Sequence, residues 1–416
     1  MKWETAKLGD YIDILSGYAF KSRDFVDNGI PVIKIKNITP PNVSLDDLSF
    51  VSDETAEKAH KYLLNYNDVL IALTGSHINQ MASVVGRVAR VKYNQPSLLN
   101  QRVGKIIAND NSKCDIDYVY YYLSQDDIKI KLATKAGGAA NQANISPSDV
   151  KALDIPFPEY DTQKMISSIL LSYDALVENN QKQIKLLEEA AQRLYKEWFV
   201  DLRFPGHETT PINDGVPEGW TEKRFYELFS FVRGKSYTSK ELSDSDGILM
   251  VNLKSIRPFG GFRRNQEKHY IGKNNADQIL EPGDIVMGVT DMTKERRLVG
   301  HVALVPDLHE KAIFSMDLIK ITPFSLPNSY LYSVLHFGGL SAQISQLANG
   351  VNVLHLKPEA MMNISMLCPD DSIIAEYDKL FSTIQNRIEI LQSECDLAVE
   401  ARDRLLPKLM NGEIEV

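Results

Sequence analysis

The chain carries the same sequence pattern twice, at a spacing of about 215 residues. Trp3 and Gly17 in the first copy correspond to Trp220 and Gly234 in the second, and both pairs are 217 residues apart. Further blocks match in the same order: Ile30–Ile38 with Ile248–Ile256, Asn67–Thr74 with Gly283–Thr290, Gly86–Ala89 with Gly300–Ala303, and Pro156–Pro158 with Leu367–Pro369. Solenoid repeats have periods of roughly 20 to 50 residues, so a period this long indicates a duplicated domain.

Each copy begins with about 155 residues that contain short runs rich in valine and isoleucine. Glycine, asparagine, aspartate and proline bound these runs, which predicts strands joined by turns. The clearest runs are Pro31–Ile35, Val69–Leu73, Val84–Val91 and Ile285–Val289. Tyr118–Leu123 and Tyr330–Leu335 are predicted as short helices at matching places. Residues 1–157 and 205–368 are therefore predicted as two similar mixed α/β domains.

The second part of each copy has the pattern of a long helix. Apolar residues recur there at steps of three and four, which is typical of a packed helix pair. In the first copy these positions are Ile166, Ile169, Tyr173, Leu176, Ile184, Leu187, Ala191, Leu194 and Trp198. In the second copy they are Ile373, Tyr377, Leu380, Ile384, Leu391, Cys395, Ala398, Arg402, Leu405 and Leu409. Asn180 lies on the first seam and Arg402 on the second, where a polar residue often sets the register.

These helical segments are predicted to form a spacer. A helix of some 40 residues is roughly 60 Å long, which is too long for the core of one such domain. Two equivalent helices in one chain can lie antiparallel against each other; the alternative is a single amphipathic helix on its own domain. We therefore expect an α+β fold in which two long antiparallel helices, residues 158–204 and 369–416, form a coiled-coil spacer between the two domains with pseudo-two-fold symmetry.

The charge distribution leaves nucleic-acid binding open. The chain has 46 Lys and Arg against 55 Asp and Glu, a net charge of -9. That balance argues at first against a nucleic-acid partner. The two helical segments, however, hold eight of the nine net negative charges. The two domains are nearly neutral, so a basic face on each remains compatible with the composition.

The loops of the two domains carry side chains suited to DNA. Two related domains held at a fixed separation can read two sites at a fixed separation. Asn, Gln and Arg form the bidentate hydrogen bonds that distinguish base edges in the major groove, although polar loops are also ordinary solvated surface. The candidates for DNA contact are Asn37, Thr74, Ser76, Asn79, Gln80, Gln101, Arg102, Asn141 and Gln142 in the first domain, and Tyr237, Arg257, Arg263, Thr290, Lys294, Arg296, Arg297 and Asn352 in the second. The candidates for phosphate contact are Lys21, Arg23, Lys34, Lys36, Lys235 and Lys254.

Motifs for catalysis or cofactor binding are missing from the sequence. It has no phosphate-binding loop of an ATPase and no glycine-rich dinucleotide fingerprint. The nearest string to the tetrapeptide of an amino-methyltransferase, Thr39–Asn42, lacks both required ends. The eight histidines and three cysteines show no metal-ligand spacing. We therefore expect a non-catalytic protein without a cofactor or metal of its own. No apolar run approaches the ~20 residues of a membrane span and the start lacks a signal peptide, so a cytoplasmic location without membrane contact is expected.

Taken together, these features resemble the specificity subunit of type I restriction–modification systems. The resemblance covers nearly the whole chain and rests on the duplicated domains and on short motifs. These motifs are Lys2-Trp3, Lys7–Asp10, Pro156–Pro158, Leu194–Pro205, Gly219-Trp220 and Arg404–Ile414. The resemblance implies a subunit that binds double-stranded DNA at an asymmetric bipartite target. It further implies two adenine-N6 methyltransferase subunits and ATP-dependent restriction (motor) subunits as partners, with S-adenosylmethionine, ATP and Mg²⁺ bound by those partners.

The helix positions offered for partner binding are Tyr173, Ile184, Leu187, Trp198, Leu380, Ile384, Leu391 and Leu405. Two other functions remain open from the residues alone. A coiled-coil scaffold that binds only protein would show no sequence-dependent DNA binding even with its partner present. A self-contained enzyme acting on nucleic acid would need a cleft that gathers titratable groups with shifted pKa values.

Overall fold

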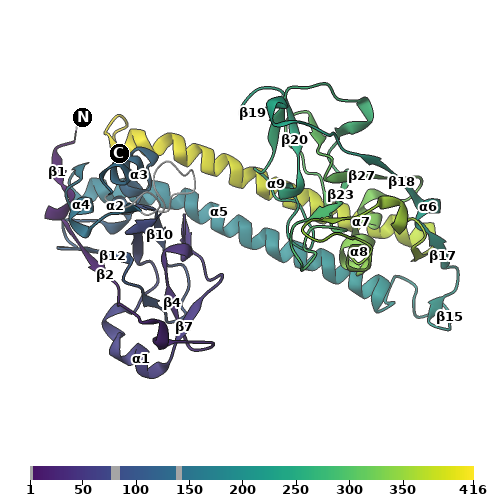
Figure 1. Cartoon of the computed structure of the whole chain (residues 1–416), viewed down its shortest axis with the longest axis horizontal. Helices are drawn as coiled ribbons and strands as arrows, with labels where there is room; N and C mark the ends of the chain where they lie inside the picture. Colours follow the sequence, from purple (N-terminus) through teal and green to yellow (C-terminus); the bar gives the residue numbers. More distant parts are fainter. Residues whose placement is uncertain (1–2, 76–84, 137–142) are drawn as a thin grey trace. The chain divides into compact units, whose positions relative to one another are not determined.

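The computed structural model describes residues 3–75, 85–136 and 143–416 (Figure 1). The chain forms two compact units. Unit 1 contains residues 1–178 and 396–416, and unit 2 contains residues 179–395. Each unit therefore combines one mixed α/β domain with a portion of both helical segments. The finer division at residues 157, 204 and 368 stays a prediction.

Unit 1 has a main sheet whose central strands follow the order β2-β12-β8-β10, all antiparallel, with β6 and β5 at one edge. Its strands are β2 (Ile12–Ser16), β12 (Val103–Ala108), β8 (Val69–Ala72), β10 (Val88–Arg90), β6 (Asn42–Val43) and β5 (Ile38–Thr39). A second sheet has the order β11-β4-β7-β3, with β11 parallel to β4. Its strands are β11 (Leu98–Leu99), β4 (Ile30–Ile33), β7 (Ser49–Val51) and β3 (Phe25–Val26). Two short antiparallel pairs complete the unit: β1 (Thr5–Lys7) with β14 (Asp154–Pro156), and β9 (Thr74–Gly75) with β13 (Ala143–Asn144).

Unit 2 repeats this arrangement. Its main sheet has the order β18-β27-β23-β25, again antiparallel, with strands β18 (Phe229–Arg233), β27 (Leu318–Pro323), β23 (Ile285–Gly288) and β25 (Val302–Leu304). Its second sheet has the order β19-β21-β20-β26-β22, with strands β19 (Leu242–Ser243), β21 (Lys268–Tyr270), β20 (Ile248–Val251), β26 (Ala312–Phe314) and β22 (Ile279–Leu280). Three short pairs are β17 (Thr221–Arg224) with β29 (Ser365–Cys368), β24 (Thr290–Asp291) with β28 (Leu354–His355), and β15 (Ile212–Asn213) with β16 (Val216–Pro217).

The duplication is confirmed at the level of the fold. Strands β26 and β20 pair in parallel, as β11 and β4 do in unit 1. The apolar runs that begin at Val69 and Ile285 form β8 and β23, which occupy equivalent central places and are buried along their whole length. A continuous apolar run is what a strand covered on both faces requires.

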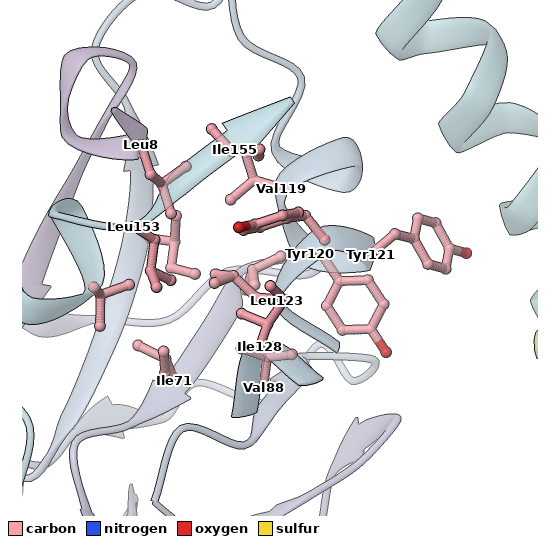
Figure 2. Packing of buried hydrophobic residues seen from close by; sticks show 14 of the residues in the cluster. Leu8, Ile71, Val88, Val119, Tyr120, Tyr121, Leu123, Ile128, Leu153 and Ile155 are labelled. Atoms are coloured by element: carbon pink, nitrogen blue, oxygen red, sulfur yellow. The ribbon is translucent and has the colours of Figure 1, made fainter. Parts of the chain in front are cut away.

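The core of unit 1 lies between the main sheet and two helices, α2 (Ile116–Ser124) and α3 (Asp126–Lys135). Figure 2 shows Val119 and Leu123 of α2 and Ile128 of α3 facing Ile71 and Val88 of the sheet. In unit 2 the equivalent helices are α7 (Asn328–Phe337) and α8 (Leu340–Ser345). The helices expected at Tyr118–Leu123 and Tyr330–Leu335 are therefore confirmed. The remaining short helices are α1 (Asp53–Lys58), α4 (Pro147–Lys151) and α6 (Phe225–Leu228).

The two long helices are also confirmed. Helix α5 (Tyr160–Tyr195) has 36 residues and continues into a π-helical turn over Lys196–Val200, and α9 (Asp371–Met410) has 40 residues. Within each unit their segments run antiparallel. In unit 1 Asp174 of α5 binds Arg402 of α9, with 2.6 Å between Oδ1 and Nη1. In unit 2 the Asn180 amide, which is 2% exposed, donates a 2.8 Å hydrogen bond to Glu394. The described residues contain no helix apolar and long enough to cross a membrane.

The predicted seam is wrong at Leu176 and Leu380, which are 43% and 42% exposed. Near its start, α5 buries Ile166 and Leu170 in the unit 1 core instead. Near its start, α9 likewise buries Tyr377 in the unit 2 core, together with Ile374 and Phe381. The reason is that these ends pack on a globular domain, so the domain and not the other helix selects the buried face.

The last turns of each helix also belong to a core. In unit 1, Leu406, Leu409 and Met410 of α9 join the main core cluster, and the Trp3 indole donates a 3.3 Å hydrogen bond to the Leu409 carbonyl. In unit 2, Trp198 after α5 packs within 5.9 Å of the Tyr377 ring. The two ends of the chain therefore meet inside unit 1.

Candidate nucleic-acid interface

In unit 2 four segments meet at one end of the main sheet. The backbone around Lys235 bridges Ser315, and the Met316 amide donates to the Lys235 carbonyl at 2.9 Å. The Thr290 hydroxyl donates to Asp317 at 3.0 Å, which joins the loop after β23 to the loop before β27. Strand β24 pairs with β28, so the loop that precedes β28 lies at the same end.

In unit 1 the equivalent segments meet in the same way. Tyr18 bridges Asn100, and the Gln101 amide donates to the Tyr18 carbonyl at 3.0 Å. The Leu73 amide donates to the Arg102 carbonyl at 3.0 Å, and the pair β9–β13 brings the fourth segment alongside. The described parts of these segments therefore lie on the same framework in both units, although their sequences differ.

The loop after β24 is held from within by a buried carboxylate. Asp291 is completely buried and accepts hydrogen bonds from the amides of Thr293, Leu298 and Val299 at 2.7, 2.6 and 3.2 Å. Burial opposes its ionisation, but these hydrogen bonds outweigh burial and hold the pKa of Asp291 below its usual value. These hydrogen bonds therefore fix the backbone conformation of this loop, residues 292–299.

Several predicted residues lie on exposed parts of this set of loops. Gln101 and Arg102 are exposed in unit 1, with Lys21 and Arg23 exposed on the segment after Tyr18. In unit 2 the residues Lys294, Arg297 and Asn352 are exposed, whereas Lys235 and Tyr237 are partly buried. Ser76, Asn79, Gln80, Asn141 and Gln142 lie outside the described residues.

Other predicted residues have partners inside the fold. Asn37 is 1% exposed, and its side-chain amide caps the turn at Lys34 and donates to the Asp46 carbonyl. The Lys34 ammonium lies 3.8 Å from the Phe25 ring and donates to Ser49. Lys36 forms an ion pair with Asp47. These three side chains therefore bind partners within unit 1.

In unit 2 some predicted residues are likewise buried or bind partners within the fold. Thr290 is buried, and the Arg296 guanidinium donates to the carbonyls of Ser345 and Ala348, which fixes the loop to the end of α8. Arg257 forms a 2.9 Å ion pair with Glu188 of α5. The turn that begins at Arg257 is joined to the loop 292–299, because the Phe259 amide donates to the Arg297 carbonyl at 2.7 Å. In unit 1, Thr74 is likewise buried.

The comparisons with known proteins agree with this architecture. A family model described as "Type I restriction modification DNA specificity domain" matches residues 1–189. Two relatives from Methanocaldococcus jannaschii are the type I restriction enzyme MjaIX specificity subunit and the putative MjaX specificity subunit. Each is 24% identical, and each alignment covers 100% of this chain and 94% of the relative. A solved structure of a type I restriction–modification S subunit from M. genitalium has a TM-score of 0.60 at 15% identity and covers 99% of this chain and 96% of that one.

The chain is thus similar over its whole length to type I restriction enzyme specificity subunits, and residues 1–189 match their DNA specificity domain. Among the described residues no group of three His, Cys, Asp or Glu side chains could hold a metal ion.

The helix positions predicted for partner binding fall into two groups. Ile184, Trp198 and Leu391 are covered by the chain's own side chains and pack the interior of unit 2. Tyr173, Leu187, Ile384 and Leu405 are partly buried, and Leu380 is exposed. Partner binding therefore stays a prediction for the positions that keep accessible surface.

Sequence reasoning missed three apolar residues on the loops of unit 2: Met292, Met316 and Val351. The search for DNA contacts considered only polar side chains. The duplication contained a usable signal, because Met316 occupies the place that Gln101 has in the first copy.

Unit 2 should lose stability as the pH falls below about 6.5. Burial, together with the charges of His301 and Arg257, lowers the pKa of His336 to about 4. The unfolded chain, with an ordinary histidine pKa of about 6.5, then takes up the proton at a higher pH than the folded chain does. Between these values the free energy of unfolding should fall by up to about 1.4 kcal/mol per pH unit because of this group.

The measurement is urea unfolding followed by tryptophan fluorescence at pH 7 and pH 5, since Trp198 and Trp220 both lie in unit 2. His336→Gln should reduce the difference between the two pH values by about 2 kcal/mol. His309→Gln removes an exposed histidine and should leave that difference as it is in the parent chain. Equal pH dependence in the parent and His336→Gln would contradict the prediction.

Proposed function

We propose that the chain recognises an asymmetric bipartite DNA target, with one half-site bound by the four-loop end of each unit. One observation carries the proposal: two matched frameworks present the same loops at the same end, while the side chains on those loops differ. Gln101 and Arg102 stand in unit 1 where Met316 and Asp317 stand in unit 2. Two readers with different contact residues fit a target whose halves have different sequences.

The exposed cations support DNA as the ligand. Lys21, Arg23 and Arg102 lie on the loops of unit 1, and Lys294 and Arg297 on those of unit 2. Such groups contact phosphates and supply affinity, while Gln101 and Asn352 can form hydrogen bonds with base edges. The two helical segments hold eight of the nine net negative charges of the chain.

We further propose that the chain directs partner subunits to this target. The expected partners are two adenine-N6 methyltransferase subunits and ATP-dependent restriction subunits. S-adenosylmethionine, ATP and Mg²⁺ would be bound by those partners. The long helices α5 and α9 leave Leu380 and Leu186 exposed, 42% and 64% respectively, as apolar surface for such partners.

The test is to map methylated adenines by long-read sequencing in a host that carries this chain and its methyltransferase partner. A two-part motif with one fixed gap supports the proposal. Methylation at a single uninterrupted motif would contradict it. As a control, the purified chain alone with S-adenosylmethionine should methylate no DNA, and robust turnover by it would reject the non-catalytic role.

Exchange of residues 1–157 for the same region of another specificity subunit should replace one half-site and leave the other unchanged. The physical reason is that the loops of unit 1 and unit 2 belong to separate cores. The methylated motif before and after the exchange is the measurement. A change in both halves would show that the two units do not read independently.

A further inference from the structure

Two apolar side chains on the loops of unit 2 are unusually exposed. Among the large apolar side chains that the structure describes, Val351 is 96% exposed and Met292 is 79% exposed, more than any other. They lie on different loops, which the pairing of β24 with β28 joins at their bases. Met316, 54% exposed, lies on a third loop of the same end. Single exposed apolar residues are ordinary, but the most exposed ones gathered at one functional end require an explanation.

The backbone holds these residues outward. Asn349 and His355 exchange hydrogen bonds of 3.0 and 2.9 Å, so Val351 stands at the tip of a tight loop. Gly350 has a φ of +155°, and a Cβ there would lie 1.8 Å from the Val353 carbonyl oxygen, so only glycine fits this turn. Met292 directly follows Asp291, whose buried carboxylate orders its loop.

The surroundings of the two residues carry the charge expected for DNA. Lys294 and Arg297 are exposed on the loop of Met292, and Asn352 is exposed next to Val351. Arg297 has one weak ion-pair contact, 3.9 Å to Glu295, so most of its hydrogen-bonding capacity is open to a ligand. A phosphate backbone would form ion pairs with Lys294 and Arg297, but it would form no favourable apolar contact with Val351 or Met292. The major groove has one apolar group on its base edges, the C5-methyl group of thymine.

We infer that Val351 and Met292 are specificity-determining residues that contact thymine C5-methyl groups in the half-site bound by unit 2. The inference rests on the proposed function, since it names how one of the two readers selects its bases. It makes apolar contact part of the recognition by unit 2, alongside hydrogen bonds from Asn352 and phosphate contacts from Lys294 and Arg297.

The test removes the methyl group from the DNA and the apolar side chain from the protein. The complex of the full chain with its methyltransferase partner is titrated with labelled duplexes that carry the mapped target. Each thymine is replaced singly by deoxyuridine, which lacks only the methyl group. At one or two thymines of the unit 2 half-site, deoxyuridine should raise Kd about fourfold, the factor for burial of one methyl-sized group. Thymines of the other half-site serve as the internal control.

Val351→Ala or Met292→Ala should raise Kd for the thymine duplex by a similar factor and remove the effect of deoxyuridine at the thymine concerned. Val216→Ala changes an exposed valine elsewhere in unit 2 and should keep the full effect. The inference is overturned if deoxyuridine has no effect in the parent complex, or if the effect persists in both loop variants. A loop variant that weakens thymine and deoxyuridine duplexes equally points to insertion between bases and also overturns it. If the parent complex binds duplexes of every sequence equally well, the proposed function is rejected instead.

Discussion

Arg90→Ala is expected to lower the free energy of unfolding of unit 1 by about 3–5 kcal/mol, the usual cost of removing one partner from a buried ion pair. Arg90 ends β10 and is only 2% exposed. Its guanidinium lies 2.9 Å from Asp117, 3.4 Å from Asp174 and 3.7 Å from the centre of the Tyr120 ring. Burial disfavours its charge, yet Asp117, with Tyr121 and Tyr120, keeps the pKa of Arg90 above its usual value. Alanine would leave these groups without a cation and open a cavity.

Lys36→Ala is the matched control, because it breaks an exposed ion pair with Asp47 in the same unit and should cost less than about 1 kcal/mol. Hydrogen exchange measured by mass spectrometry reports on each unit through its own peptides. Faster exchange should appear throughout the unit 1 peptides of Arg90→Ala. Arg90→Met restores much of the volume without the charge and separates the loss of packing from the loss of the ion pairs. Equal costs for Arg90→Ala and Lys36→Ala would show that the buried pair contributes nothing.

Leu391→Ala is expected to destabilise unit 2 by about 2–5 kcal/mol, the range for removing a buried leucine side chain. Leu391 is completely buried on α9, near the Asn180–Glu394 hydrogen bond. Ile390→Ala is an unusually close control, because Ile390 is the preceding residue and is 50% exposed. Surface substitutions of this kind stay within about 0.5 kcal/mol.

Urea unfolding followed through Trp198 and Trp220 measures both variants in the same unit. A lower midpoint for Leu391→Ala with an unchanged midpoint for Ile390→Ala is the expected result. Similar midpoints for the two variants would mean that the helix pair is not packed through the face that contains Leu391.

The duplication was the sequence feature whose predictions agreed best with the structure. Matched blocks predicted two domains of one fold, and the repeated strand order of the two main sheets follows from them. The steps of three and four predicted the long helices and most of their buried faces. They failed at Leu176 and Leu380 because a globular domain, which the periodicity does not encode, covers that end of each helix.

The loop residues were predictable only in part. The types Asn, Gln, Arg and Lys predicted DNA contacts on these loops, but residue type does not say which partner a side chain finds. Arg257 meets Glu188, 69 residues earlier in the sequence, and Arg296 meets carbonyls about 50 residues later. Such pairs follow from the tertiary fold. The exposed Val351 was not among the predicted contacts, because an apolar side chain is normally expected to be buried.

The order in which the two units can finish folding differs from their order along the sequence. Unit 2 is one continuous stretch, residues 179–395, whereas unit 1 also needs residues 396–416. Leu406, Leu409 and Met410 fill part of its core, so during translation unit 1 waits with an uncovered apolar surface until the last turns of α9 have emerged from the ribosome. Unit 1 is thus the later of the two to close, and a chain that ended before residue 396 would contain a complete unit 2 and an incomplete unit 1.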